Sequence, residues 1–275
     1  MLSLVAHGRK MDLNLPRVMG VVNCTDDSFY EGSRSLEKTK LEEKIYEMHS
    51  QGADIIDIGG RSSRPGSRHL DDQEELDRVA HSIEFVKANF PEQWCSIDTT
   101  SAVVAEFALS KGVEIVNDIS AGTMDARLWS IVAQWKVPYV CMHMQGTPDT
   151  MQIDPRYFDV VEEIASFFKT KISLLHSAGI EQVILDPGFG FGKTIAHNYQ
   201  LMQGLSSFQQ LNCPILVGVS RKSMIYKLLE ISPEQALNGT TVLHTYALVQ
   251  GARLLRVHDV GEAKEVVRLI QAITA

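Results

Sequence analysis

Polar side chains recur directly after short apolar runs along this chain. Asp98, Asn117 and Asp186 all occupy such positions. Because a carboxylate accepts two hydrogen bonds in one plane, two carboxylates beside an amide suit a heterocycle that presents several N–H donors on one edge. The further members of the series are Asn23, Arg64, His143, Arg221, Lys222, Arg256 and His258. Helix capping would account for a few of the Asp and Asn residues but not for so consistent a series, which therefore indicates a binding site.

A group of basic residues within this series indicates an anion site. Its members are Arg64, Lys222, Arg256 and His258. Guanidinium and ammonium groups bind phosphate oxygens through charge-assisted bonds worth about 1.5 to 3 kcal/mol each where water is excluded. Arg221 could instead pair with a neighbouring carboxylate. Since the whole chain carries a formal net charge of −8, an anion must be captured by such local cations, and we expect neither nucleic acid nor a membrane as a partner.

The segment DPGFGFGKT is interpreted as a turn, because a P-loop requires glycine where this chain has Pro187. Its glycines would let the backbone approach a flat ligand, with Phe191 packing on a ring face, although a purely conformational role explains them equally well. His143 is interpreted as a hydrogen-bonded wall and not as a catalytic group. The His, Asp and Glu spacings form no compact metal motif, so a metal held jointly by Asn23 and a substrate phosphate is the better hypothesis.

These side chains require a scaffold that brings strand ends together. Short runs rich in Val and Ile alternate with longer amphipathic stretches, which is typical of βα units around a parallel sheet. Eight runs can be counted, which end at Asn23, Asp98, Asp118, Asp186, Ser220 and His258 or begin at Ile55 and Tyr139. Between the first two runs, Leu41, Ile45 and Met48 share one helix face, and Gly52 ends that helix.

Eight evenly spaced units predict a single (β/α)₈ barrel, or TIM barrel, as one domain over residues 1–275. Residues 1–15 precede the first barrel strand and leave room for a short hairpin. A doubly wound open sheet uses the same alternation and is the competing architecture. In a barrel the active site forms at the carboxyl ends of the strands, which is where the polar series falls.

The composition is that of an ordinary globular protein, with 44% hydrophobic and 22% charged residues. The N-terminal apolar run is too short for a signal peptide, and no later stretch has the length of a membrane helix. Four cysteines lie far apart, mostly in apolar runs, and are interpreted as reduced core thiols. We therefore expect an enzyme of the cytoplasm.

Eight sequence motifs, taken together, resemble those of dihydropteroate synthase. They are MGVVNCTDDSF, GADIIDIGGRSSRPGS, SIDTTSAVVAEFAL, EIVNDIS, MHMQGTPDTMQ, ILDPGFGFGKT, LVGVSRKS and RVHDV. The resemblance covers nearly the whole chain, and eight motifs in the family's order are far more specific than any single one. It implies a dimeric transferase of folate biosynthesis, a sulfonamide target, that joins 6-hydroxymethyl-7,8-dihydropterin diphosphate to p-aminobenzoate and releases diphosphate with the help of Mg²⁺.

The resemblance also assigns roles to individual residues. The pterin would be bound by Asp98, Asn117, Asp186, Phe191, Gly218 and Lys222. The diphosphate would be bound by Asn23, Arg64, Arg256 and His258, with Asn23 also contacting Mg²⁺. The p-aminobenzoate would lie against Phe29, Ser63, Pro65 and Ser223. Catalysis would fall to Asp98, Lys222 and Arg256, with little acid–base chemistry, because the dihydropterin ring can delocalise the positive charge left by departing diphosphate.

Three positions depart from the family's usual pattern. Asp26 stands where proline is frequent, Arg61 where glutamate is frequent, and Ser63 where threonine is frequent. Ser63 keeps the hydroxyl, and a mobile loop would tolerate Asp26. Arg61 reverses a charge next to the p-aminobenzoate loop, so it bears on loop closure and sulfonamide affinity more than on pterin binding.

Two alternative functions are compatible with a pterin-binding ring. A related barrel transfers a methyl group from a folate to a corrinoid, but the SRKS and RVHD motifs speak against it because such an enzyme has no diphosphate to bind. A homologue that binds pterin without catalysis is the second alternative. The intact set Asn23, Arg64, Lys222, Arg256 and His258 argues against it.

Overall fold

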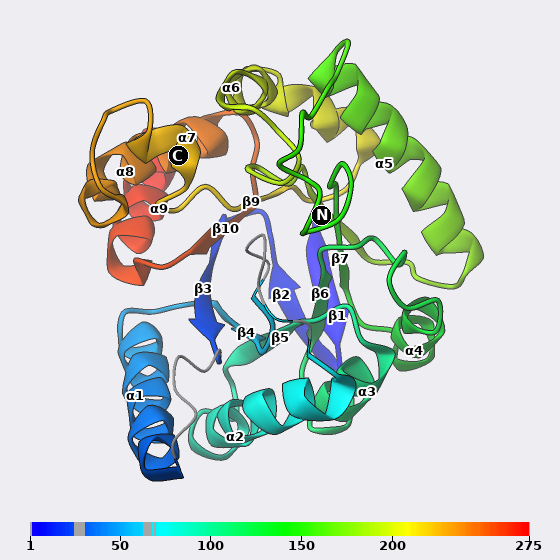
Figure 1. Cartoon of the computed structure of the whole chain (residues 1–275), viewed down its shortest axis with the longest axis vertical. Coiled ribbons are helices and arrows are strands. Elements are labelled where there is room, and N and C mark those ends of the chain that lie inside the picture. The colour runs from blue at the N-terminus through cyan, green and yellow to red at the C-terminus, as the bar shows by residue number, and fades with distance from the viewer. Residues whose placement is uncertain (1, 25–30, 63–67, 69, 275) are drawn as a thin grey trace.

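In the computed structural model, which describes residues 2–24, 31–62, 68 and 70–274, eight parallel strands form one sheet surrounded by an outer ring of helices (Figure 1). The strands are β3 (Arg17–Asn23), β4 (Ile55–Gly59), β5 (Trp94–Asp98), β6 (Ile115–Asp118), β7 (Tyr139–Met142), β8 (Val183–Asp186), β9 (Leu216–Val217) and β10 (Leu254–Val257). Their order in the sheet is β8-β7-β6-β5-β4-β3-β10-β9.

The two ends of this sheet meet, so the sheet is a barrel. A parallel bridge joins Leu185 of β8 to Ile215, which directly precedes β9. The amide of Leu185 also donates to the carbonyl of Pro214 at 2.9 Å. These contacts remove the open edges of a doubly wound sheet and confirm the predicted (β/α)₈ barrel.

The helices follow the strands in alternation, as the apolar periodicity predicted. They are α1 (Glu31–Ser50), α2 (Asp72–Asn89), α3 (Ala102–Ser110), α4 (Leu128–Trp135), α5 (Val160–Ser177), α6 (Ile195–Gln203), α7 (Ser223–Tyr226), α8 (Leu237–Val249) and α9 (Val260–Thr274), with 3-10 helices at Leu205–Leu211 and Pro233–Gln235. Ile45 and Met48 of α1 are buried against the barrel, and Gly52 has the positive φ that ends that helix. The side chain of Asp71 caps α2 by accepting from the amide of Glu74 at 2.8 Å.

The strands are apolar over nearly their whole length because both faces of the sheet are covered. Every residue of β4, β6, β7 and β8 is buried. Outward side chains pack under the helices and inward ones fill the barrel, as in parallel sheets generally. Polar residues inside these strands are therefore exceptional, and those at the carboxyl ends mark the open end of the barrel.

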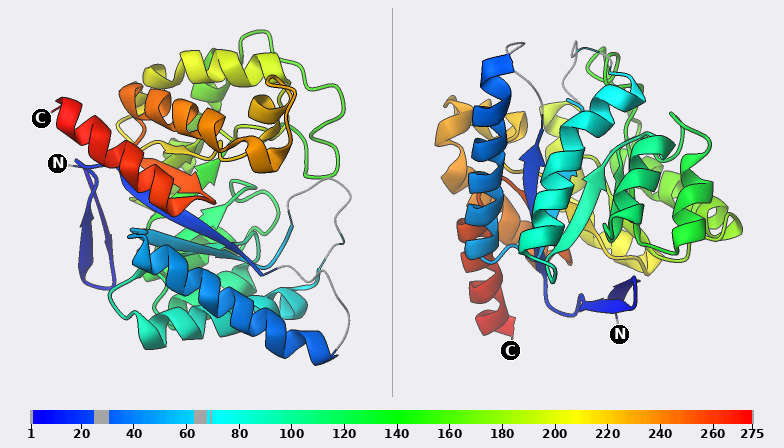
Figure 2. Two further views of the ribbon diagram at one scale, coloured as in Figure 1. Left: turned by 90° about the vertical axis from the view of Figure 1, so that its left-hand side faces the viewer. Right: turned by 90° about the horizontal axis from the view of Figure 1, so that it is seen from below.

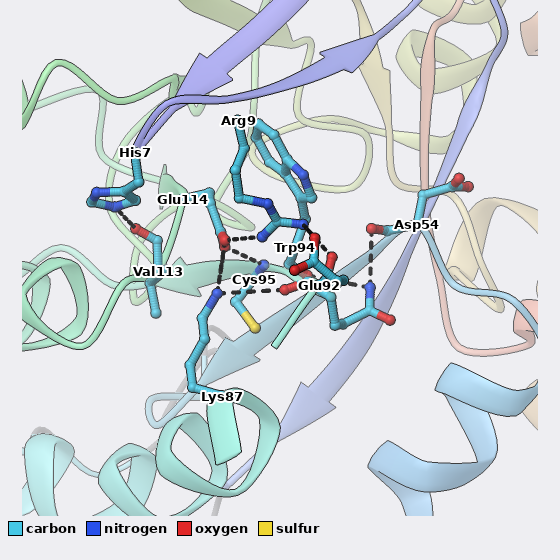
Figure 3. A network of polar contacts seen from close by, with 10 residues as sticks. His7, Arg9, Asp54, Lys87, Glu92, Trp94, Cys95, Val113 and Glu114 are labelled. Carbon is cyan, nitrogen blue, oxygen red and sulfur yellow. Dashed lines mark hydrogen bonds and ion pairs between the residues drawn. The ribbon is translucent and has the colours of Figure 1, made fainter. Parts of the chain in front are cut away.

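The N-terminal hairpin, β1 (Ser3–Ala6) and β2 (Arg9–Asp12), lies at the opposite end of the barrel from the carboxyl ends of the strands (Figure 2). Figure 3 shows how it is attached: Arg9 Nη1 donates to Glu114 Oε1 at 2.7 Å, and Lys87 Nζ lies 2.7 Å from the other carboxylate oxygen. Glu114 is buried just before β6 and also accepts from the amide of Cys95. The hairpin thus closes the amino end of the barrel, which leaves the carboxyl end for ligands.

Candidate active site

Strands β5, β6 and β8 bring the predicted carboxylate and amide side chains to one end of the barrel, with β7 between β6 and β8. Asp98 ends β5, and it lies directly opposite Asn117 of β6 in the ladder between these strands. Asp186 ends β8, two strands further around. Asn117 and Asp186 are buried, whereas about a quarter of the Asp98 side chain, 23%, remains accessible. Asp98, Asn117 and Asp186 therefore lie at the carboxyl ends of strands of the same barrel, as the sequence predicted.

A buried ion pair inside the barrel orders Asp98 and Asn117. Arg256 of β10 donates from Nε to Asp57 Oδ2 at 2.7 Å and from Nη2 to Asp98 Oδ2 at 2.6 Å. The same Asp57 oxygen accepts from Asn117 Nδ2 at 3.1 Å. Asp57 is fully buried in the middle of β4. One carboxylate thus fixes the guanidinium and the amide that the sequence had placed in the site.

Asp57 was missed by reasoning from the sequence, which considered only the residues at strand ends. The signal was a single carboxylate within the apolar run IIDIG. A charge there must be paired because an isolated buried carboxylate is strongly disfavoured. Arg256 consequently has two of its donor groups on carboxylates, which gives it a part in orienting Asp57 and Asp98.

The turn that follows β8 surrounds the third carboxylate. The amide of Gly188 donates to Asp186 Oδ1 at 2.8 Å. Lys222 donates to the carbonyl oxygen of Phe189, and its Nζ lies 4.7 Å from the centre of the Phe191 ring. The half-buried Phe191 ring and the free edge of Asp186 therefore belong to the same part of the site as Lys222.

Two glycines keep this part of the site open. A Cβ at Gly218 would lie 3.8 Å from Arg256 Cβ and 4.0 Å from Lys222 Nζ. A Cβ at Gly190 would lie 3.4 Å from Lys222 Cδ. Gly218 has no unusual φ, so its backbone would accept a side chain. That side chain would fill the space beside Arg256 and Lys222.

A buried lysine next to this turn was also missed. Lys193 is only 4% exposed, and its Nζ donates to the carbonyls of Gly188 and Phe191 at 2.9 Å each. It also lies 3.1 Å from His143 Nδ1. His143 is buried at the end of β7 with its ring edge-on to Phe167, which agrees with a hydrogen-bonded wall. The sequence signal for Lys193 was the basic residue of the rejected P-loop pattern.

Burial controls the ionisation of these groups. Burial raises the pKa of Asp98 to about 7, against the opposing effect of Arg256. Burial also raises the pKa of Asp186, opposed most strongly by Lys222, and lowers the pKa of Lys222 to about 8. Burial lowers the pKa of Lys193 to about 7. A ligand that donates N–H bonds to the two carboxylates would favour their ionised forms and so lower both pKa values again.

The predicted anion-binding residues that the structure describes include Asn23 and His258, at the carboxyl ends of β3 and β10. Asn23 ends β3 with an exposed side chain. His258 follows β10, and its Nδ1 lies 3.1 Å from the hydroxyl of Ser220, which also accepts from the His258 amide. Partial burial, with the nearby Lys44 and Arg256, lowers the pKa of His258. The sequence predicts His258 as a cation, but at neutral pH a ring with this lowered pKa is uncharged and can only donate or accept hydrogen bonds.

Arg221 is paired with a carboxylate, as the alternative interpretation allowed. Its guanidinium binds both oxygens of Asp259, at 2.8 and 2.9 Å, and donates to the carbonyl of Glu234 at 2.5 Å. Ser223 begins α7, which has only four residues. Phe29, Ser63, Arg64 and Pro65, as well as the variant position Asp26, lie outside the described residues.

The unusual Arg61 has carboxylate partners on α2. Its Nη2 donates to Asp72 Oδ1 at 3.1 Å, and its Nε forms an ion pair with Glu75. Glu75 is fully buried and accepts from the hydroxyl of Thr99 at 2.6 Å. Burial raises the pKa of Glu75, and Thr99 and Arg61 oppose that shift. Arg61 therefore compensates a buried carboxylate that adjoins the end of β5.

Comparisons with known proteins agree on one family. The model of the family "Pterin binding enzyme" matches residues 19–258. The chain is 41% identical over 273 residues to the dihydropteroate synthase of Escherichia coli (strain K12), covering 98% of this chain and 96% of that one. It is 39% identical to the enzyme of Haemophilus influenzae, covering 98% of each chain.

Solved structures give the same result. A Yersinia pestis dihydropteroate synthase in complex with a sulfonamide drug superposes with a TM-score of 0.93 at 40% identity, covering 99% of each chain. A Xanthomonas albilineans dihydropteroate synthase in complex with 7,8-dihydropteroate superposes with a TM-score of 0.88 at 36% identity, again covering 99% of each chain.

Proposed function

The chain belongs to the dihydropteroate synthase family of pterin-binding enzymes, and we propose how its own residues carry out that family's reaction. The enzyme is a transferase of folate biosynthesis. It joins 6-hydroxymethyl-7,8-dihydropterin diphosphate to p-aminobenzoate, giving 7,8-dihydropteroate and diphosphate. The observation that best supports the residue roles is that Asp98, Asn117 and Asp186 all lie at the carboxyl ends of strands of one barrel.

The pterin would be recognised by these three side chains together with Phe191, Gly218 and Lys222. Asp186 uses one oxygen on the Gly188 amide and keeps the other for ring N–H groups, and Asp98 likewise uses one oxygen on Arg256. Asn117 is oriented by Asp57. The space above Gly218 would receive the flat ring. Burial makes each charge-assisted bond in this pocket worth about 1.5 to 3 kcal/mol.

The diphosphate would be bound by Asn23, Arg64, Arg256 and His258 at the same end of the barrel. Arg256 has only part of its guanidinium free of carboxylates, and His258 would contribute as a neutral donor. The described residues contain no cluster of three or more His, Cys, Asp or Glu side chains for a metal. A single amide oxygen, that of Asn23, nevertheless fits Mg²⁺, which keeps several waters and commonly binds substrate phosphates. When bound there, Mg²⁺ would supply positive charge to the leaving diphosphate.

Catalysis would require charge stabilisation and positioning rather than proton transfer. Asp98, Lys222 and Arg256 surround the place where the diphosphate leaves and positive charge develops on the pterin. Asp98 would oppose that charge, while Lys222 and Arg256 would oppose the negative charge of the leaving group. The amine of p-aminobenzoate needs only to be held in line with the methylene carbon.

The p-aminobenzoate would lie against Ser223 and against Phe29, Ser63 and Pro65, which are outside the described residues. Its carboxylate would accept from the Ser223 hydroxyl. Because α7 has only four residues, its helix dipole is small, and the hydroxyl would be the stronger contribution. The stem of Lys222 would separate this ring from the pterin.

We also propose a homodimer of single-domain chains, with residues 1–275 as one domain in each. Exposed apolar side chains gather on two neighbouring helices, α8 and α9: Val242, Tyr246, Val249, Leu269 and Ile273. Such a patch favours burial against a second copy.

Sedimentation of the wild type and of Val249→Glu tests the proposed homodimer, with Leu174→Glu on the exposed side of α5 as the control. A wild type that sediments as a monomer contradicts it.

The cytoplasm is the proposed location. Cys95 and Cys141 are buried free thiols, as is usual in a reducing compartment. None of the helices in the described part of the chain could cross a bilayer. The proposed partners are the two small-molecule substrates. With a net charge of −8, the chain favours neither nucleic acid nor an anionic membrane.

Diphosphate release by the purified protein tests the proposed site as a whole. The protein is given the dihydropterin diphosphate and Mg²⁺, with and without p-aminobenzoate. We expect release that depends on p-aminobenzoate and is matched by dihydropteroate. Methyl transfer without any diphosphate release would favour the related methyltransferase, and pterin binding without turnover would favour a non-catalytic homologue.

A further inference from the structure

Two lysines hold the turn between β8 and α6 from different directions. Lys222 donates to the carbonyl of Phe189. Lys193 donates to the carbonyls of Gly188 and Phe191, at 2.9 Å each. The carbonyls of Gly188 and Phe191 therefore accept from Lys193, whereas the carbonyl of Phe189 accepts from Lys222. Together these bonds fix the conformation of the turn.

Lys193 uses all of its donors within the protein. An ammonium group has three N–H donors. Its nearest partners are the two carbonyl oxygens and His143 Nδ1 at 3.1 Å, and the carbonyl oxygen of His143 lies further away at 3.4 Å. Burial lowers the pKa of His143 to about 3, so its ring is neutral and can accept from the ammonium. Lys193 is 4% exposed and its amino group is surrounded by these protein partners, so it would act through them and not by touching a substrate.

The turn also packs against the segment after β7 without any intervening side chain. A Cβ at Gly188 would overlap the carbonyl oxygen of His143, and a Cβ at Gly192 would lie 2.6 Å from the carbonyl oxygen of Gln145. Both glycines have positive φ values, 69° and 62°. Lys193 therefore joins the ends of two adjacent strands where their backbones are in direct contact.

The carbonyl partners of Lys193 belong to residues that shape the pterin pocket. Gly188 directs Asp186 by donating to its Oδ1, and Phe191 carries the ring beside Lys222. We propose that Lys193 is a positioning residue for pterin recognition, because it fixes Gly188, Phe191 and His143 so that Asp186 and Phe191 face the ring. This inference rests on the proposed pterin site and deepens it.

Lys193→Met tests the proposal, because methionine is of similar length and lacks the donors. The matched control is Lys171→Met, since Lys171 also donates to a carbonyl, that of Ala121 at 2.8 Å, but on the outer side of the barrel. Calorimetric titration with 6-hydroxymethylpterin gives Kd, steady-state kinetics give both KM values and kcat, and thermal unfolding reports stability.

In Lys193→Met we expect Kd for the pterin and KM for the dihydropterin diphosphate to rise about tenfold or more, the equivalent of 1.4 kcal/mol. The KM for p-aminobenzoate should stay within about twofold of the wild-type value, a difference in free energy smaller than RT. Lys171→Met should change none of the three. A purely structural lysine would lower the melting temperature and the active fraction without this separation between substrates.

Unchanged pterin affinity in Lys193→Met overturns the inference, as does an equal rise in both KM values. If that variant does not fold, Lys193→Gln, which keeps an amide donor for one carbonyl, is titrated in its place with the same two outcomes. A wild type that binds pterin without forming dihydropteroate would contradict the proposed function but leave the titration of Lys193 valid.

Discussion

The guanidinium of Arg256 and the carboxylate of Asp57 are joined at 2.7 Å inside the barrel, and the pair reaches the site through Asp98 and Asn117. Asp57 is fully buried, whereas 24% of the Arg256 side chain is exposed. The ion pair therefore connects the barrel interior to its open end. We therefore expect the proposed catalytic arrangement to depend on Asp57, which lies outside the proposed substrate contacts.

Asp57→Asn tests that dependence. The amide keeps the shape but loses the charge, and breaking a buried ion pair costs about 3 to 5 kcal/mol at most. We expect kcat/KM for the dihydropterin diphosphate to fall at least about tenfold, or 1.4 kcal/mol, with a lower melting temperature. Asp54→Asn, which loses contacts to Arg17 and Lys264 outside the site, should lower stability only. Wild-type kinetics in Asp57→Asn would contradict this account.

Gly218→Ala tests whether the open space is the ring pocket. The added Cβ meets Arg256 and Lys222 only at ordinary contact distance, so the fold should keep its melting temperature. Pterin affinity should fall about tenfold, since the methyl group occupies the volume of the ring. Gly261→Ala is the control because its Cβ also has only ordinary contacts, near Gln51. Equal pterin affinities in Gly218→Ala and Gly261→Ala would show that the pterin does not bind beside Gly218.

Arg61→Glu restores the residue frequent in the family but places a third carboxylate beside Asp72 and buried Glu75. We expect a lower melting temperature and a higher KM for p-aminobenzoate, with unchanged pterin affinity. Like charges at this spacing cost on the order of 1 kcal/mol or more when partly buried. Arg156→Glu, which disturbs only an exposed pair with Asp154, provides the control. A more stable Arg61→Glu protein would refute the role given to Arg61.

The buried ring of His143 should make the free energy of unfolding depend on pH in the acidic range. Burial, with the repulsion of the neighbouring Lys193 second, lowers its pKa to about 3, below an unfolded value of about 6.5. Between these values the unfolded state binds more protons, so the free energy of unfolding falls as the pH drops from about 6.5 towards 3, by at most about 1.4 kcal/mol per pH unit.

His143→Gln removes this titration while leaving other histidines, such as the buried His244, unchanged. Urea unfolding at pH 7.5 and pH 5, conditions on the two sides of about 6.5, gives the free-energy difference between wild type and variant. We expect the advantage of the wild type to shrink at the lower pH. The same difference at both values would show that His143 is not buried as a neutral ring.

The sequence was sufficient for the barrel because its strands are apolar on both faces and several of them end in a polar residue. Asn23, Asp98 and Asp186 were all placed correctly at strand ends. The run up to Ser220 was predicted as a full strand, but only Leu216 and Val217 pair in the ladder with β10. The apolar composition of a segment indicates that it is buried. Whether its backbone pairs in a ladder also depends on the path of the neighbouring strand.

Asp57 and Lys193 could not be found in this way, because their importance comes from partners distant in the sequence. Asp57 meets Arg256 only after the barrel closes. Lys193 meets His143 only when β7 and β8 lie side by side. The same limit applied to Arg221, whose bond to Asp259 decided between two interpretations that the sequence left open.

The central claim, that Asp186 recognises the pterin, is tested most directly by calorimetric titration of 6-hydroxymethylpterin into the wild type and Asp186→Asn. The amide accepts through only one of its two atoms and carries no charge, so the loss should be about 1.5 to 3 kcal/mol, or roughly 10- to 150-fold in Kd. A similar melting temperature would show that the fold is intact. Equal affinity in the two proteins would remove Asp186 from the pterin pocket and contradict the account.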